Sequence, residues 1–188
     1  MRSVLLAGIL VLAACTTALT AGIRDTSFTD AQGSRTIQFS DWIPAPPAEV
    51  YAAIATVEGW KTWAVPSAFG EARLGAIMET SYDPAAKVGD PANIQQEFLE
   101  LVPNKRVAFR TVRTPPGFPE AELYYKTIAA FDLAPDNGGT HLTFTHSGFG
   151  EGKGFDTLYS FFREGDASTL EALRKRFETG PKEFGKTE

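Results

Sequence analysis

The sequence predicts an α+β fold in which an antiparallel sheet grips one long C-terminal helix. Segments with strand-like alternation follow one another through the middle of the chain, and the last segment has a sustained helical period. Consecutive strands followed by a helix favour an α+β arrangement over alternating parallel units. The 188 residues are enough for one domain with a hydrophobic core, so a single domain is expected.

Composition places the chain among globular proteins and excludes several function classes. Hydrophobic residues make up 43% of the chain and charged residues 22%, which argues against disorder, collagen and coiled coils. The net charge of −5 removes the attraction on which nucleic-acid binding depends, so no such partner is expected. The single cysteine excludes an internal disulfide and a thiolate zinc site, and we expect neither a metal nor another cofactor.

Residues 1–14 are predicted to be a signal peptide. A short basic segment precedes residues 4–12, an apolar run too short for a stable transmembrane helix. The run leads to Cys15 in the sequence Leu-Ala-Ala-Cys, which resembles the bacterial lipobox. We therefore expect export to the periplasm or cell envelope and a membrane anchor through acylated Cys15. The alternative is a soluble secreted protein cleaved after Ala18 or Ala21.

The remaining chain divides into three parts. Residues 15–35, rich in threonine, alanine and glycine, have no sustained apolar period and are predicted to be a flexible tether. The folded domain is expected at residues 36–178. Residues 179–188, which include a Gly-Pro pair, are predicted to be a disordered tail.

The domain is predicted to begin with one strand and two short helices. Residues 36–43 alternate polar and apolar and stop at a proline, as an edge strand does. A proline pair suits the first turn of the next segment, and apolar residues recur at helical spacing over residues 48–56. After Gly59, a second helical segment would place Trp60 and Trp63 on one face.

Five further strands are predicted from alternation or from β-branched and aromatic content, over residues 76–82, 94–102, 106–112, 124–133 and 140–146. Residues 136–139, Asp-Asn-Gly-Gly, form the clearest hairpin turn because these residue types tolerate positive φ. The sheet is therefore expected to be mostly antiparallel. The inward face of the strand at residues 94–102 stays open, since Leu99 and Leu101 favour one face and Phe98 the other.

The last element is predicted to be a helix over residues 155–178, ended by Gly180 and Pro181. Apolar residues along it recur at spacings of three and four, which forms one stripe that faces a core. The basic run at residues 174–176 is expected to be a solvated helix end that the helix dipole favours.

Several of these segments together resemble a known family. They are Val50-Tyr51 with Trp63, Pro103, the run from Gly139 to Phe149, and Gly165 followed by Leu170 and Leu173. Over residues 36–178 the chain is similar to the START-like (SRPBCC) superfamily, in the branch named after the activator homologue of the 90-kDa heat-shock chaperone's ATPase. The resemblance implies a helix-grip (START/Bet v 1-like) fold, in which a curved antiparallel sheet wraps the C-terminal helix and encloses an apolar cavity. Where the family usually has tryptophan after the helix glycine, this chain has Asp166.

The resemblance implies binding of a hydrophobic small molecule, lipid-like or polyketide-like, between the sheet and the last helix. Two alternatives stay open. One is an enzyme of the cyclase or hydrolase kind that uses the same pocket without metal or nucleotide, and the other is a protein-interaction module that resembles a co-chaperone. The candidate ligand-binding residues are Trp60, Trp63, Tyr82, Phe109, Phe131, Phe144, His146, Phe155, Tyr159, Phe162 and Asp166.

Two polar candidates could carry chemistry. Alternation places His146 on the same strand face as Leu142 and Phe144, and it turns His141 towards solvent. Asp166 falls on the inward stripe of the last helix. A histidine and an aspartate in an apolar pocket could act as acid and base. The alternatives are a hydrogen-bonded structural role for His146 and an exposed Asp166 at the rim.

The glycine-rich segment at residues 148–154 follows a strand and precedes a helix, but its spacing does not match a phosphate-binding loop. We expect either a mobile loop that gates the mouth of the pocket or a loose surface connection. No serine stands in a Gly-x-Ser-x-Gly context, so no standard hydrolase nucleophile is visible.

Overall fold

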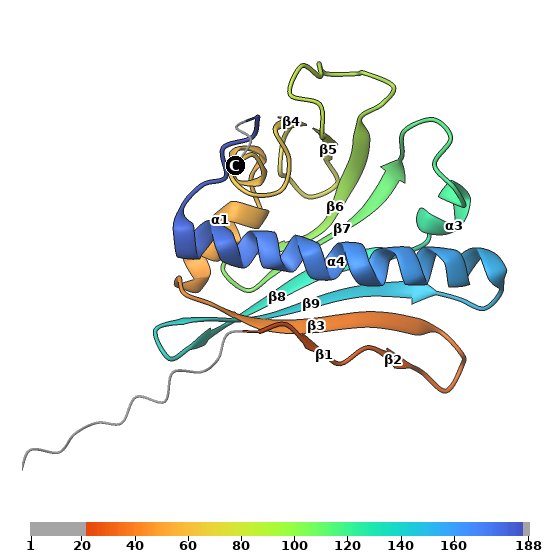
Figure 1. Ribbon diagram of the computed structural model, residues 1–188, viewed down its shortest axis with the longest axis horizontal. Helices are drawn as coiled ribbons and strands as arrows, with labels where there is room; N and C mark the ends of the chain where they lie inside the picture. Colours follow the sequence, from red (N-terminus) through yellow and green to blue (C-terminus); the bar gives the residue numbers. More distant parts are fainter. Residues whose placement is uncertain (1–21, 186–188) are drawn as a thin grey trace, which may run out of the picture.

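The computed structural model describes residues 22–185, in which one curved sheet wraps around a long C-terminal helix (Figure 1). The predicted signal peptide and Cys15 lie outside the described residues. The α+β class, the antiparallel sheet and the helix-grip arrangement are confirmed. Within residues 22–185, no helix combines the length and the apolar character needed to cross a membrane.

The sheet contains nine strands: β1 (Arg24–Asp25), β2 (Phe28–Thr29), β3 (Arg35–Ile43), β4 (Ser67–Gly70), β5 (Ile77–Ser81), β6 (Ile94–Val102), β7 (Arg106–Arg113), β8 (Ile128–Asp136) and β9 (Gly139–Phe149). The helices are α1 (Pro47–Ile54), α2 (Val57–Trp60), α3 (Ala121–Tyr124) and α4 (Lys153–Thr179). The strand order is β1-β3-β9-β8-β7-β6-β5-β4, with β2 also paired to β3, and each of these neighbouring pairs is antiparallel. β4 and α3 are not predicted from the sequence. The strand expected from residue 124 begins only at Ile128, because α3 and a turn precede it.

The chain before β3 is not a free tether, so that prediction is wrong for residues 24–29. β1 and β2 both pair with β3, which places them beside it in Figure 1. Arg163 of α4 also binds Asp25, with Nη2 and Oδ2 2.6 Å apart. These short polar segments add to the sheet through backbone hydrogen bonds, which need no hydrophobic period.

Trp60, the last residue of α2, and Trp63, in the turn that follows, both bind back to α1. Trp60 Nε1 donates to the carbonyl of Ile54 at 2.8 Å, and Trp63 Nε1 donates to the carbonyl of Ala53 at 2.9 Å. The two indole rings lie 5.3 Å apart on one buried face, as the sequence predicts. Because each buried indole N–H has a partner, both rings can face the interior without a desolvation penalty.

β6 changes face part-way, which explains its mixed sequence pattern. Gln96 and Phe98 point inward, a β-bulge lies between Phe98 and Glu100, and Leu101 packs against the core beyond the bulge. A bulge adds one residue to a strand and so moves the following side chains to the other face. Neither inward face considered from the sequence holds for the whole strand.

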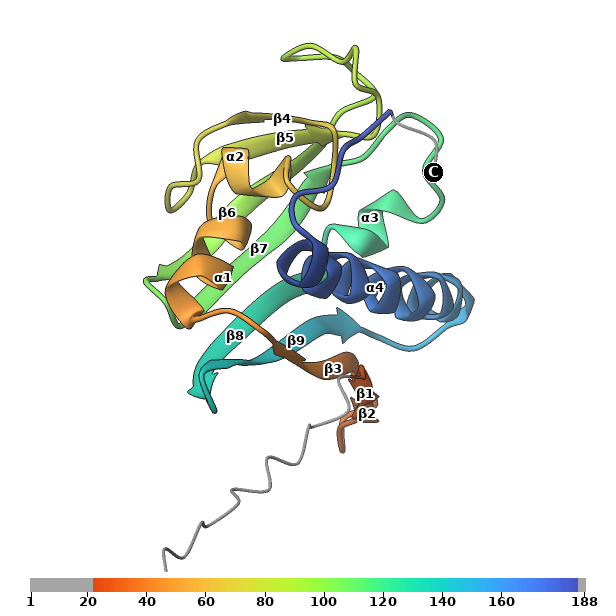
Figure 2. The ribbon, with the colours of Figure 1, turned by 60° about the vertical axis from the view of Figure 1, so that its left-hand side comes forward.

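α4 lies along the concave side of the sheet (Figure 2). Its buried stripe contains Leu158, Leu170 and Leu173. Arg174, expected in solvent, instead reaches the fully buried side chain of Asp41, with Nη1 and Oδ2 3.0 Å apart. Beyond α4 the predicted disordered tail is also partly fixed, since the Lys182 backbone N–H donates to the carbonyl of Thr62 at 2.8 Å. Both predictions are wrong at these positions.

Candidate functional site

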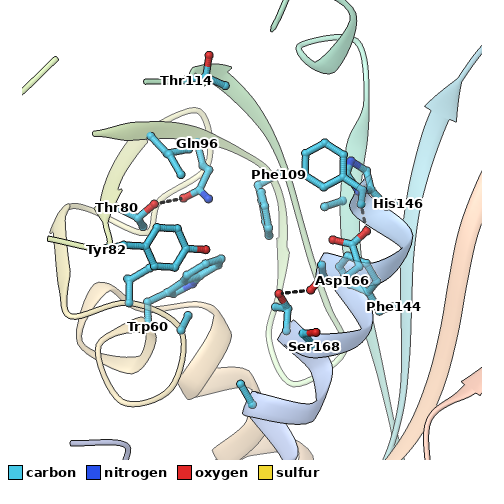
Figure 3. A pocket seen from close by; sticks show the side chains of 18 of the residues that line it. Trp60, Thr80, Tyr82, Gln96, Phe109, Thr114, Phe144, His146, Asp166 and Ser168 are labelled. Atoms are coloured by element: carbon cyan, nitrogen blue, oxygen red, sulfur yellow. Dashed lines mark hydrogen bonds and ion pairs between the residues drawn. The ribbon is translucent and has the colours of Figure 1, made fainter. Parts of the chain in front are cut away.

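A cavity of about 430 Å³ lies between the sheet and α4, and Figure 3 shows it from close by. Aromatic side chains form the largest group in its wall and come from separate elements, with Trp60 from α2, Phe109 from β7, Phe131 from β8, Phe144 from β9 and Phe162 from α4. The Trp60 and Phe109 rings lie 5.6 Å apart, and the Phe131 and Phe144 rings 4.9 Å apart. The aromatic side chains make this part of the wall apolar. It is also preformed, because neighbouring rings hold one another in place.

All but two of the predicted ligand-binding residues line this cavity: Trp60, Trp63, Tyr82, Phe109, Phe131, Phe144, His146, Phe162 and Asp166. Tyr82 does so while 74% exposed, which places it at the mouth. Phe155 and Tyr159 do not line it. They lie near the start of α4, and the part of this helix that borders the cavity begins at Phe161. The Tyr159 ring packs 5.4 Å from that of Phe149 and lies under the Arg35 guanidinium, 4.9 Å from the ring centroid.

Several lining residues are not predicted from the sequence. They include Thr80, Gln96, Thr114, Pro115, Phe118, Tyr124, Phe161 and Lys182. Most stand in loops, in the unpredicted helix α3 or in the tail, where no periodic pattern marks an inward face. Thr80, Gln96 and Phe161 are exceptions, because they lie in β5, β6 and α4. For Gln96 the alternation with Phe98 is an available signal. The glycine-rich segment contributes no lining residue, so the idea that it gates the mouth is not supported. Arg35 Nη2 instead donates to the carbonyl of Gly150 at 2.7 Å.

His146 and Asp166 meet in the wall of the cavity. His146 Nδ1 and Asp166 Oδ2 are 2.9 Å apart, and the residues are only 3% and 9% exposed. β9 brings the histidine and α4 brings the aspartate, so the two predicted faces converge here. The alternative of an exposed Asp166 at the rim is wrong.

Aromatic rings hold the imidazole of His146 in place. It packs edge-on against Phe149, with ring centroids 4.7 Å apart, and against Phe162 at 4.8 Å. Tyr124 packs against both rings, with its centroid 4.4 Å from that of Phe162 and 6.0 Å from that of His146. Burial raises the pKa of Tyr124 far above its usual range, so its phenol stays protonated. That hydroxyl accepts a hydrogen bond from Thr111 Oγ1 at 3.0 Å.

The second imidazole nitrogen binds a threonine. His146 Nε2 lies 2.9 Å from Thr127 Oγ1, which gives the order Asp-His-Thr of a nucleophilic triad. The Thr127 side chain is not placed to act as a nucleophile, because the residue is 1% exposed and does not line the cavity. Its hydroxyl also lies 2.8 Å from the carbonyl of Tyr124 and can donate to it. The arrangement fixes the imidazole between a carboxylate and a hydroxyl but presents no hydroxyl to a bound molecule.

Thr80 and Gln96 supply polar groups at the opposite end of the cavity, across from His146 and Asp166 in Figure 3. Thr80 Oγ1 lies 3.5 Å from Gln96 Oε1. Lys182 reaches the cavity from the tail. Residues 22–185 contain no group of three His, Cys, Asp or Glu side chains that could hold a metal ion.

Comparison with known proteins gives a family and several solved structures of similar fold. The family described as Activator of Hsp90 ATPase homolog 1-like protein matches residues 44–178. The Aha1 dimer from Colwellia psychrerythraea is 24% identical with a TM-score of 0.60, over 77% of this chain and 97% of that chain. Protein MLL2253 from Mesorhizobium loti is 21% identical with a TM-score of 0.61, over 77% and 97%. CalU16 from Micromonospora echinospora is 18% identical with a TM-score of 0.59, over 88% of each chain.

Comparison with curated proteins found no match. At these identities the solved structures establish the fold, and the family model covers more than half of the chain. The resemblance stated from the sequence is therefore confirmed for both family and fold. The chain belongs to the Activator of Hsp90 ATPase homolog 1-like family, with a START-like helix-grip domain.

Proposed function

We propose that this protein binds a hydrophobic small molecule in the cavity between the sheet and α4. The observation that carries the proposal is the aromatic-lined space of about 430 Å³ in the domain. Ligand pockets commonly have volumes of roughly 300–1,000 Å³. Protein interiors otherwise pack as densely as organic crystals, so a space of this size is costly unless it is used.

The cavity favours this function over the two alternatives. A co-chaperone-like interaction module acts through its surface and has no need of an internal space lined by Trp60, Phe109 and Phe144. A hydrolase of the nucleophilic kind needs an accessible hydroxyl beside the histidine, and Thr127 is buried away from the cavity. The pair of His146 and Asp166 therefore supports polar selection of a ligand within a binding pocket.

The proposal is tested by filling the cavity with a side chain. Gly165 lines the cavity from α4, and a Cβ added there would meet no heavy atom within 4 Å. In Gly165→Trp the indole can therefore occupy open space without displacing packed groups, and it replaces a poor helix former. Native mass spectrometry of the protein purified from a bacterial host is expected to show an extra mass that organic extraction removes. We expect Gly165→Trp to lack that mass while its circular dichroism spectrum stays unchanged.

The matched control is Glu164→Trp, at the neighbouring residue, which is exposed like Gly165 but lies outside the lining. It is expected to retain the bound mass. A wild-type protein that stays empty after incubation with lipid and aromatic mixtures would contradict the proposal. Equal retention by Gly165→Trp and by the wild type would contradict it as well.

We also propose that the protein is exported and anchored through acylated Cys15. The support is the apolar run at residues 4–12 followed by a lipobox-like sequence. A single acyl chain binds membranes only marginally, so the several chains of a bacterial lipoprotein are what would make the anchor stable. Full-length protein is expected to incorporate labelled palmitate and to sediment with membranes, and Cys15→Ser is expected to do neither. Incorporation of label into Cys15→Ser would contradict this part of the proposal.

A further inference from the structure

We propose that the ligand carries a hydroxyl or N–H group that donates a hydrogen bond to Oδ1 of Asp166, so that Asp166 selects which apolar molecules bind. This inference rests on the proposed function of the cavity. It adds a chemical class to that function, namely an apolar body with a hydrogen-bond donor at one end.

The argument begins with the two oxygens of one carboxylate. Oδ2 of Asp166 is bound to His146 Nδ1 at 2.9 Å, whereas Oδ1 has no hydrogen-bond partner within residues 22–185. Asp166 is 9% exposed and lines the cavity, and Figure 3 shows its carboxylate between His146 and the open space. Oδ1 is not one of the fully buried oxygens that lack a partner, so it is reached from the open space of the cavity. A ligand that fills this space without a donor would leave Oδ1 with neither water nor a hydrogen bond, which is unfavourable. A donor on the ligand supplies the missing bond.

The protons around His146 keep this oxygen an acceptor. The Thr127 hydroxyl has one hydrogen, which goes either to the Tyr124 carbonyl at 2.8 Å or to His146 Nε2 at 2.9 Å. If His146 receives it, Nε2 is bare and the Nδ1 hydrogen is given to Asp166. If Tyr124 receives it, Nε2 carries its own hydrogen and one further proton lies between Nδ1 and Oδ2. In both arrangements the proton sits on the His146 side of the carboxylate, and Oδ1 remains bare.

The surroundings of this oxygen favour a ligand donor over an internal ion pair. The charged or titratable side chains that line the cavity with Asp166 are His146, Tyr124, Tyr82 and Lys182. Tyr82 is at the exposed mouth, and the Lys182 Nζ lies over the Phe184 ring, 4.8 Å from its centroid. None of the ion pairs within residues 22–185 joins Asp166 to a lysine or arginine. The aromatic wall then packs against the apolar body of the ligand, while Asp166 accepts a hydrogen bond from its polar end.

The test uses two probes that share one apolar body. Protein stripped by organic extraction and refolded is titrated with 2-naphthol, which has a hydroxyl donor, and with 2-methoxynaphthalene, which has none. Wild-type protein is expected to bind 2-naphthol about tenfold more tightly, the factor that one hydrogen bond in a desolvated site supplies. In Asp166→Leu the two dissociation constants are expected to be equal. In the matched control Glu164→Leu, which removes an exposed carboxylate of α4 outside the lining, the preference is expected to persist.

The outcomes separate this inference from the proposed function. If wild-type protein binds both probes with equal affinity, the inference is wrong and the proposed function stands. If it binds neither probe and also lacks an extractable mass, the proposed function fails and the inference fails with it. The comparison of the two probes on wild-type protein needs no variant, so it decides the question even if Asp166→Leu does not fold.

Discussion

Asp41 of β3 has a fully buried side chain that is bound on both sides. Its Oδ1 accepts from the Trp42 backbone N–H at 2.8 Å, and its Oδ2 lies 3.0 Å from Arg174 Nη1. Burial raises the pKa of Asp41 above its ordinary value, although the Arg174 guanidinium acts in the opposite direction. Arg174 is shared with Glu178, at 3.5 Å, so its charge is already partly compensated. Desolvation of the ionised Asp41 carboxylate therefore costs more free energy than its pairing with Arg174 recovers.

We predict that Asp41→Asn gains stability relative to the wild type as the pH rises. A carboxyl whose pKa is raised in the folded state contributes stability below its unfolded value of 3.8, and that contribution is lost as the pH passes through the folded pKa. Asparagine does not titrate and keeps the acceptor for Trp42. Urea denaturation at pH 4 and pH 7 is expected to show the stability difference between the variant and the wild type shifting by about 1 kcal/mol in favour of the variant at the higher pH. A shift in the opposite direction would contradict this account.

The loop between β5 and β6, at residues 82–93, is held by one carboxylate at its base. Glu79 Oε2 accepts from Asn93 Nδ2 at 2.7 Å and from the Gly89 backbone N–H at 2.8 Å, and Oε1 accepts from Gln95 Nε2 at 3.0 Å. Burial acts to raise the pKa of Glu79, but these hydrogen bonds outweigh it and the pKa lies below its ordinary value. The loop begins at Tyr82, so this carboxylate fixes one side of the cavity mouth.

Glu79→Gln is predicted to loosen this loop without unfolding the sheet. A carboxyl with a lowered folded pKa contributes stability above the unfolded value of 4.5, and that contribution is lost as the pH falls through the folded pKa. At pH 7 the variant should lose about 1–3 kcal/mol of stability, with faster hydrogen exchange at Gly89. The matched control is Glu97→Gln, whose partner Arg110 is 47% exposed. This control should cost about 1 kcal/mol or less. An unchanged rate of hydrogen exchange at Gly89 in Glu79→Gln would contradict the claim that Glu79 holds this loop.

At the scale of the whole molecule, the N-terminal segment stabilises a sheet edge far from the cavity. β1 and β2 pair with β3, and Asp25 joins this edge to Arg163 of α4. None of residues 22–35 lines the cavity. The edge and the site are therefore held together only through the shared sheet and helix.

Deletion of residues 1–33 is predicted to lower the stability of the protein by about 2 kcal/mol while the ligand affinity stays the same. The loss combines a few backbone hydrogen bonds with one exposed ion pair. The bared β3 edge should also promote association, because unpaired strand edges recruit other chains. Urea denaturation, probe titration and size-exclusion chromatography measure the three effects. A loss of probe binding in folded, truncated protein would show that the edge supports the site.

The resemblance predicted the family and the helix-grip fold, and the residue pattern predicted the long final helix and the inward faces that carry Phe144, His146, Phe162 and Asp166. The helix and the inward faces could be predicted because periodicity reports which side of a single strand or helix is buried. The meeting of His146 and Asp166 follows from the same reasoning, since one inward face packs on the other in a helix-grip fold.

Contacts between segments that have no period, or that lie far apart in the chain, became visible in the three-dimensional structure alone. The pairing of Asp41 with Arg174, separated by 133 residues, turned an expected solvated charge into a buried one. β1 and β2 joined the sheet, and Lys182 reached the cavity, through backbone hydrogen bonds that depend little on side-chain identity. Such contacts are set by how elements pack in space. A local pattern describes one element at a time and cannot specify them.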